Sequence, residues 1–197
     1  ICVIPQGTTK NWVITKRSIG NADGTKCIIG GIRVEGDSWV NAYDVAIHPT
    51  GLAKHVQNGY FGSYPYGVLV TKTTTENCHV TLSNLDVVAC DEFHTNEGTL
   101  LAVDYESKAV VLAQNWHGTT NGCRYAQIYG GDVTIKNCVI SNSYNYAVRV
   151  GKDGTKCTLT GNLVDHPVFV DLHSSLANAT VTFGDGVTDD NHYSANV

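Results

Sequence analysis

Aromatic, amide, guanidinium and carboxylate side chains recur at alternate positions of a predicted strand family, and this combination suits sugar recognition. Rings pack on the apolar faces of sugars, while planar polar groups hold hydroxyls or uronate carboxylates in fixed geometry. The candidate substrate-binding residues on this outward face are Tyr125, Gln127, Tyr129, Arg149, Asp171 and His173, and the same alternation adds Asp44, His48, Asp104 and Phe169. The sequence therefore predicts a glycan-binding surface.

A plainer interpretation of the same face is structural. Arg149 and Asp171 are predicted to lie one turn apart, roughly 4.8 Å between strands, where they would form a surface salt bridge that contributes little to stability. Both interpretations stay open from the sequence.

Cleavage of a glycosidic bond usually needs two carboxyl groups roughly 5 to 9.5 Å apart. Asp104 and Asp171 are predicted to lie three turns apart, about 14 Å at strand spacing. A self-contained hydrolase on this face is therefore disfavoured, although Asp91 or Glu92 of a predicted projecting loop, or a neighbouring subunit, could complete one. Elimination on a uronate polymer needs a base and a cation. Arg149 with Tyr125 or His173 could supply them, so the sequence leaves a polysaccharide lyase or glycoside hydrolase open and names no catalytic residue.

No cofactor is predicted. Two acidic clusters could bind calcium, but neither matches the twelve-residue calcium loop, and solvated acidic turns are the default interpretation. The clusters are Asp91, Glu92, His94 and Glu97, and then Asp185, Asp189 and Asp190. The seven cysteines lack metal-ligand spacing. Cys27, Cys138 and Cys157 are interpreted as small core hydrophobes.

The elements that must position these residues come from a repeat centred on residues 132–140. With Val133 at offset zero, the other copies begin at Cys27, Lys54, Val80, Val110, Cys157 and Val181, at intervals of 23 to 30 residues. Offset two is apolar throughout, with Ile29, Val56, Leu82, Leu112, Ile135, Leu159 and Phe183. A pattern of two apolar positions with a position of mixed residue types between them is typical of a strand with one buried face.

Offset four carries a bend residue after each of these strands, namely Gly31, Asn58, Asn84, Gln114, Asn137, Gly161 or Asp185. A second strand family follows, at residues 43–47, 66–70, 99–103, 124–128, 146–150 and 168–172. Two families advancing together predict a solenoid in which each strand pairs with its equivalent one turn away. The predicted fold is all-β, a single-stranded right-handed parallel β-helix of about seven turns, with residues 1–197 as one domain.

The repeat of a strand, an Asn-bearing turn and a second strand resembles the right-handed parallel β-helix of the pectate-lyase-like superfamily, which includes phage tailspikes. The turn residues Asn58, Asn84 and Asn137 are in register in this repeat. The resemblance covers roughly residues 27–185. Residues 184–190 also resemble an element near the start of many such β-helices. No Gly-His-Gly or Asn-Thr-Asp motif of the polygalacturonase type is present. The resemblance implies polysaccharide recognition, a homotrimer and an extracellular or virion-surface location.

Composition and charge limit the kinds of partner that the chain is expected to bind. The net charge is −5 and the pI is near 5.8, with scattered Lys and Arg, so neither nucleic acid nor an anionic membrane is an expected partner. No run of eighteen apolar residues exists, so membrane insertion is not expected. The absence of Met favours a processed piece of a larger chain, and no signal peptide is recognised at the start. The alternative function is a purely structural virion or cell-surface rod without a ligand.

Overall fold

The computed structural model describes residues 2–3, 11–20, 30–48, 66–71, 73, 77–90, 99–105, 107–121, 124–141, 146–165, 168–172 and 178–194. These residues form strands and connections without any helix, and every strand pair is parallel. Within them, no helix is long and apolar enough to cross a membrane. The all-β class and the parallel pairing predicted from the repeat are confirmed.

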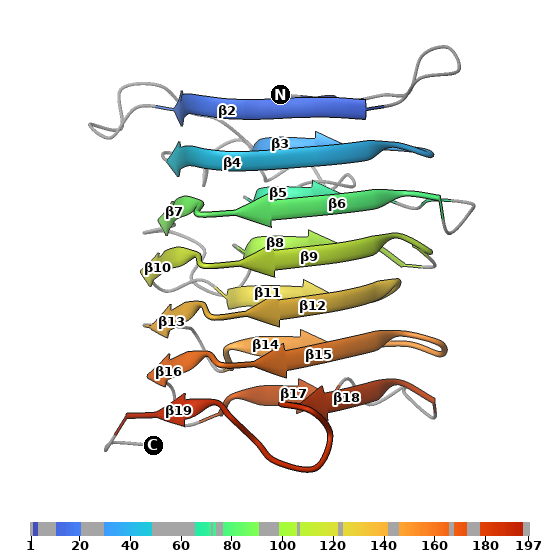
Figure 1. Ribbon diagram of the computed structural model, residues 1–197, viewed down its shortest axis with the longest axis vertical. Coiled ribbons are helices and arrows are strands. Elements are labelled where there is room, and N and C mark those ends of the chain that lie inside the picture. Colours follow the sequence, from blue (N-terminus) through green and yellow to red (C-terminus); the bar gives the residue numbers. More distant parts are fainter. Residues whose placement is uncertain are drawn as a thin grey trace, which may run out of the picture.

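The strands of the first sheet follow one another along the chain and pair in the same order. They are β1 (Cys2–Val3), β3 (Gly30–Val34), β5 (Tyr66–Val70), β8 (Thr99–Val103), β11 (Arg124–Ile128), β14 (Val148–Val150) and β17 (Val170–Leu172). Figure 1 shows these strands stacked in layers behind the second sheet.

The second sheet branches from the long strand β4 (Trp39–His48), against which β2 (Asn11–Gly20) pairs on the other side. The upstream arm continues through β6 (His79–Ser83), β9 (Val110–Gln114), β12 (Asp132–Lys136), β15 (Lys156–Thr160) and β18 (Thr180–Phe183). The downstream arm continues through β7 (Asp86–Cys90), β10 (His117–Asn121), β13 (Val139–Ser141), β16 (Leu163–Asp165) and β19 (His192–Tyr193). In Figure 1, β2 lies at one end of the stack and β18 and β19 at the other.

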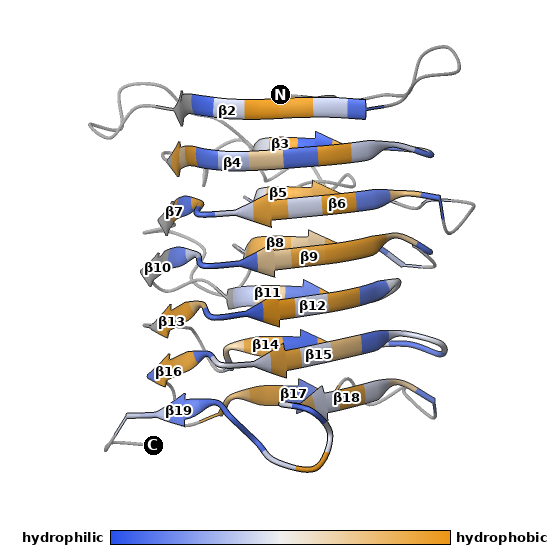
Figure 2. Ribbon diagram, in the orientation of Figure 1, coloured by the Kyte–Doolittle hydropathy of each residue, from blue (hydrophilic) through white to orange (hydrophobic). Residues whose placement is uncertain are grey.

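The core consists of inward columns that cross the layers. Val40, Val80, Val111, Val133 and Cys157 form one column in register, and Ala42, Leu82, Ala113, Ile135 and Leu159 form the next, all buried. Buried and more exposed residues alternate along β6, β9, β12 and β15, and Figure 2 shows apolar segments on strands throughout the stack. Cys138 and Cys157 are buried free thiols, as expected for core hydrophobes, and burial raises the pKa of Cys157 to about 12. Cys27 lies outside the described residues.

Three assignments from the repeat are wrong. Val111 and Ala113, not Val110 and Leu112, occupy the inward column of β9, because the strand register is shifted by one residue. Residues 43–47 belong to β4 in the second sheet, and Gly31 lies in β3 instead of at a corner. The short downstream arm was not predicted, and Lys54, Val56 and Asn58 lie outside the described residues.

The corner between the two arms requires a left-handed backbone. Asn84, Asn115 and Asn137 adopt φ of 55°, 57° and 53°, a conformation that asparagine tolerates better than most residues. Asn115 donates to Asn84 Oδ1 at 3.3 Å, and Asn84 donates to Asp44 Oδ1 at 3.2 Å, so this corner is a ladder between layers. The predictions for Asn84, Asn137 and Gly161 are confirmed. Those for Gln114 and Asp185 are wrong, because Asn115 and Gly184 take the left-handed positions.

The buried column of side chains that follows this corner changes from apolar to polar residues along the stack. Leu85, Trp116 and Cys138 give way to Asn162 and Asn191, both buried. The Asn162 side chain accepts from the Cys138 amide at 2.9 Å and donates to the Ile135 carbonyl at 3.0 Å and to Asn191 Oδ1 at 2.8 Å. Hydrogen bonds thus replace apolar packing towards the β19 end.

Candidate functional site

Three of the predicted side chains form one column on the outer face of the first sheet. Gln127, Arg149 and Asp171 are in register on β11, β14 and β17 and are partly exposed. Arg149 Nε lies 2.5 Å from the Asp171 carboxylate, so the predicted ion pair between adjacent layers forms. Partial burial acts to lower the pKa of Arg149, but the hydrogen bond to Asp171 and the charges of its neighbours raise it overall.

Tyrosine rings lie beside this column. Tyr105 and Tyr129 stack with ring centroids 4.8 Å apart and planes within 5°. The Arg149 guanidinium lies 4.3 Å from the centre of the buried Tyr146 ring, and Lys152 Nζ lies 3.9 Å from that of Tyr105. We call Tyr105, Tyr129, Tyr146, Arg149 and Lys152 the tyrosine cluster. Burial is the main reason that the pKa of Tyr129 is raised, and Arg149 partly opposes it.

The prediction that Tyr125 belongs to the outer face is wrong. Its side chain is fully buried, with its ring 6.5 Å from Trp116, and burial raises its pKa well above the ordinary value. The strict alternation fails where the chain enters the strand, since Tyr125 and Ala126 are consecutive buried residues, as are Leu100 and Leu101 in the layer before. Phe169 is also buried, next to the partly buried Val170 at the start of β17, so its assignment to the outer face is wrong.

The remaining predicted positions do not join the cluster. Asp44 and His48 lie on β4 of the second sheet, so their assignment to this face is wrong. His173 lies outside the described residues, as do Asp91, Glu92, His94 and Glu97. Asp104 follows β8, three layers from Asp171 along the first sheet, and accepts the Tyr105 amide at 2.8 Å. That separation is about 14 Å at strand spacing, too far for a two-carboxylate mechanism.

Sequence reasoning missed Tyr105 and placed Tyr146 on the inward side without its role under Arg149. A signal was present for Tyr105: it precedes Tyr129 by 24 residues, which is one repeat. Residues one layer apart at a fixed offset can stack, as these two rings do.

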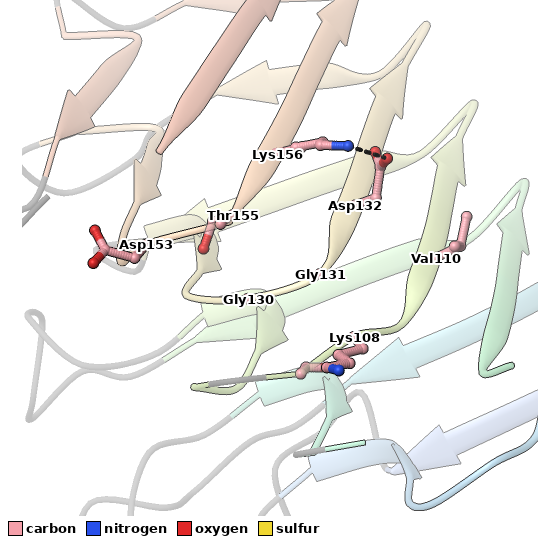
Figure 3. Close-up of a pocket in the computed structure, with 10 residues that line it drawn as sticks. Lys108, Val110, Gly130, Gly131, Asp132, Asp153, Thr155 and Lys156 are labelled. Carbon is pink, nitrogen blue, oxygen red and sulfur yellow. Dashed lines mark ion pairs between the residues drawn. The ribbon is translucent and has the colours of Figure 1, made fainter. Parts of the chain in front are cut away.

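A groove of about 450 Å³ lies at the corner between the first sheet and the upstream arm (Figure 3). It is lined by Ser107, Lys108, Val110, Gly130, Gly131, Asp132, Asp153, Gly154, Thr155 and Lys156. Lys156 Nζ and an Asp132 carboxylate oxygen lie 4.0 Å apart across it, both side chains more than half exposed. Gly130 directly follows Tyr129 and Asp153 directly follows Lys152, so the groove adjoins the tyrosine cluster.

The acidic C-terminal loop uses its carboxylates for its own hydrogen bonds. Asp185 accepts the amides of Val187 and Thr188, and Asp190 accepts the Thr160 hydroxyl and the Gly161 amide. Asp189 accepts from Tyr193 and Asn191. Among the described residues, no group of three His, Cys, Asp or Glu side chains is placed to hold a metal ion. The geometry is that of an internally bonded turn.

This loop should be sensitive to acid. The amides of Thr188 and Val187 lower the pKa of Asp185. A carboxylate whose pKa is lowered by folding stabilises the native state above its unfolded pKa, and that contribution is lost as the pH falls through the folded pKa. We expect Asp185→Asn to be less stable than the parent at pH 7, by a difference that becomes smaller as the pH falls to 2, as measured by thermal unfolding. An equal difference between the two proteins at both pH values would contradict this linkage.

No protein-family model matches the chain, and neither the curated proteins nor the solved structures contain a match to it. Family membership therefore contributes no substrate and no catalytic residue, and the chemistry rests on the side chains described above.

Proposed function

We propose that this chain is a single-stranded right-handed parallel β-helix of the pectate-lyase-like, tailspike-like class that recognises a polysaccharide. All-parallel pairing of strands one repeat apart and the asparagine corner support the fold assignment. With that class we also propose a homotrimer on a virion or an extracellular surface.

The observation that carries the function is the stacked pair of the exposed Tyr105 and the partly exposed Tyr129, with Arg149 and Lys152 beside it. Tyr105 is 40% exposed, so its ring offers an apolar edge to a ligand while its stacked partner Tyr129 holds it in place. Gln127 and the Arg149–Asp171 pair supply planar donors and acceptors on the adjoining strands. Rings beside fixed planar polar groups bind sugars because they match both the apolar face and the hydroxyl edge of a pyranose.

Recognition is proposed, and not cleavage. Asp104 and Asp171 are three layers apart, and Arg149 is already paired with Asp171. A hydrolase would need carboxylates other than these two. A lyase would need a base, and a cation other than the paired Arg149.

Removing the Tyr129 ring should weaken glycan binding. We expect Tyr129→Ala to lose about tenfold in affinity, on the order of 1.4 kcal/mol, because the Tyr105 ring loses its stacking support. Screening the parent on a glycan array identifies the ligand, and calorimetric titration of the variants measures the loss. Tyr43→Ala, a partly exposed tyrosine at the far end of the upstream face, is the matched control. A parent that binds no glycan, or two variants that bind equally, would contradict the proposal.

The second candidate is a structural rod, which one observation favours. Each cation of the tyrosine cluster already has an internal partner, since Arg149 pairs with Asp171 and lies over Tyr146, and Lys152 lies over Tyr105. A rod predicts that Tyr129→Ala lowers thermal stability while no glycan binds to the parent.

A further inference from the structure

A second line of side chains crosses the layers on the outer face of the upstream arm. Trp39, His79, Val110, Asp132 and Lys156 occupy the same register position on β4, β6, β9, β12 and β15. Residues in register on parallel strands point the same way, so these five side chains form one row about 19 Å long. The row lies on a different sheet from Gln127, Arg149 and Asp171.

One end of the row is an aromatic pair, Trp39 and His79, which we call the Trp39–His79 ledge. Trp39 is 54% exposed, and its ring centroid lies 4.9 Å from that of His79 at an interplanar angle of 57°. Val110, in the next layer, is 39% exposed. Tryptophan side chains bury most of their large apolar surface in most folds. Here about half of the Trp39 indole is exposed to solvent while a neighbouring ring holds it in place, so the indole is available to a ligand.

The other end of the row opens into the groove. Val110, Asp132 and Lys156 belong both to the row and to the groove wall, as Figure 3 shows on three adjacent strands. Gly130, which is buried, and the partly exposed Gly131 line the groove without side chains. A volume of about 450 Å³ is in the range of sites that hold a small ligand or one part of a longer one.

The charges lining the groove balance. Lys108 and Lys156 contribute two positive charges, and Asp132 and Asp153 contribute two negative charges. Such a site provides donors and acceptors together without a net field, which suits hydroxyl groups, since each hydroxyl both donates and accepts. An acidic polymer would meet Asp132 and Asp153 as well as the lysines, and like charges held together are unfavourable.

From this geometry we infer a second carbohydrate subsite, in which a neutral, hydroxyl-rich glycan chain runs along the stack from the groove to the Trp39–His79 ledge. The inference rests on the proposed function, since it assigns a further contact surface and a ligand class to the same glycan recognition. It differs from that proposal in placing a contact on the upstream arm, away from the tyrosine cluster.

The test compares two tryptophan variants of the full chain on an array of neutral oligosaccharides, such as gluco- and manno-oligomers, and uronate-containing ones. Trp39→Ala is expected to lose at least fivefold in affinity for the neutral glycans bound by the parent. Trp12→Ala, which removes an indole of comparable exposure from β2 at a register position off the row, is the matched control and should bind like the parent. Thermal unfolding of both variants confirms that they are folded.

The outcomes separate the two proposals. If Tyr129→Ala weakens binding but Trp39→Ala behaves like Trp12→Ala, the second subsite is wrong and the proposed function stands. If the parent binds uronate oligosaccharides alone, the neutral ligand class is wrong. If it binds nothing on the array, the proposed function fails and the subsite with it. Binding of neutral glycans that Trp39→Ala weakens supports both.

Charge variants give a second readout that does not depend on the indole. Asp132→Asn combined with Asp153→Asn leaves Lys108 and Lys156 unbalanced in the groove. We expect this double variant to gain affinity for uronate oligosaccharides, with a gain that shrinks as salt is added. Unchanged preference between neutral and acidic glycans would overturn the role of charge balance in the groove.

Discussion

Replacing Asn162 with alanine is expected to lower the free energy of unfolding by about 3 to 6 kcal/mol. The side chain is fully buried and holds three partners from neighbouring layers. Its loss would leave the Cys138 amide, the Ile135 carbonyl and the Asn191 side chain short of a hydrogen bond in the core. Each such orphaned group costs about 1 to 3 kcal/mol, and the cavity left behind adds to the loss.

Urea unfolding of Asn162→Ala against the parent measures this effect. Thr158→Ala is the control, because Thr158 lies on β15, the strand that precedes Asn162, and points outward with its side chain partly exposed. We expect the control to change stability by less than about 1 kcal/mol. Asn162→Asp keeps the acceptor but removes both donors, so it should also be strongly destabilised at pH 7. A loss for Asn162→Ala no greater than that of Thr158→Ala would show that the asparagine column does not hold the layers together.

Substituting Gly131 with alanine should destabilise the chain by about 2 kcal/mol more than the same change at Gly154. Both glycines line the groove and adopt left-handed backbone, with φ of 76° and 81°. A Cβ at Gly131 would lie 2.5 Å from the Ala109 carbonyl oxygen, which accepts the Asp132 amide at 2.9 Å. A Cβ at Gly154 would meet nothing within 4 Å.

Comparing Gly131→Ala with Gly154→Ala isolates the effect of close approach between layers. The cost of placing alanine in a left-handed backbone conformation, about 1 to 2 kcal/mol, is common to both sites. Thermal and urea unfolding of the two variants measure the difference. If both lose the same stability, the Ala109 backbone moves aside freely, and the two adjacent layers are less tightly joined than the Gly131 contact indicates.

Most of the strand columns and the asparagine corner could be predicted from the amino-acid sequence. Val80, Val133 and Cys157 lie inward as expected because alternation along a strand is a local property of an extended backbone. Asn84 and Asn137 lie at left-handed corners because few other side chains accept that conformation. Of the site, the sequence predicted Gln127, Tyr129, Arg149 and Asp171 on partly exposed positions, and the ion pair between adjacent layers.

The register of β9 and the inward position of Tyr125 could be known from the tertiary structure alone. Val110 and Val111 are both apolar, so alternation alone could not choose which one faces inward, and packing against Val80 and Val133 selected Val111. Tyr125 turned inward because the amides of Tyr125 and Ala126 both donate to the Ala147 carbonyl, so that two consecutive residues are buried and the period of two is broken. The Tyr105–Tyr129 stack, the groove and the row from Trp39 to Lys156 depend on which layers are neighbours. Residues one repeat apart come into contact only when their layers lie next to each other. The local preferences of the chain do not specify which layers are neighbours.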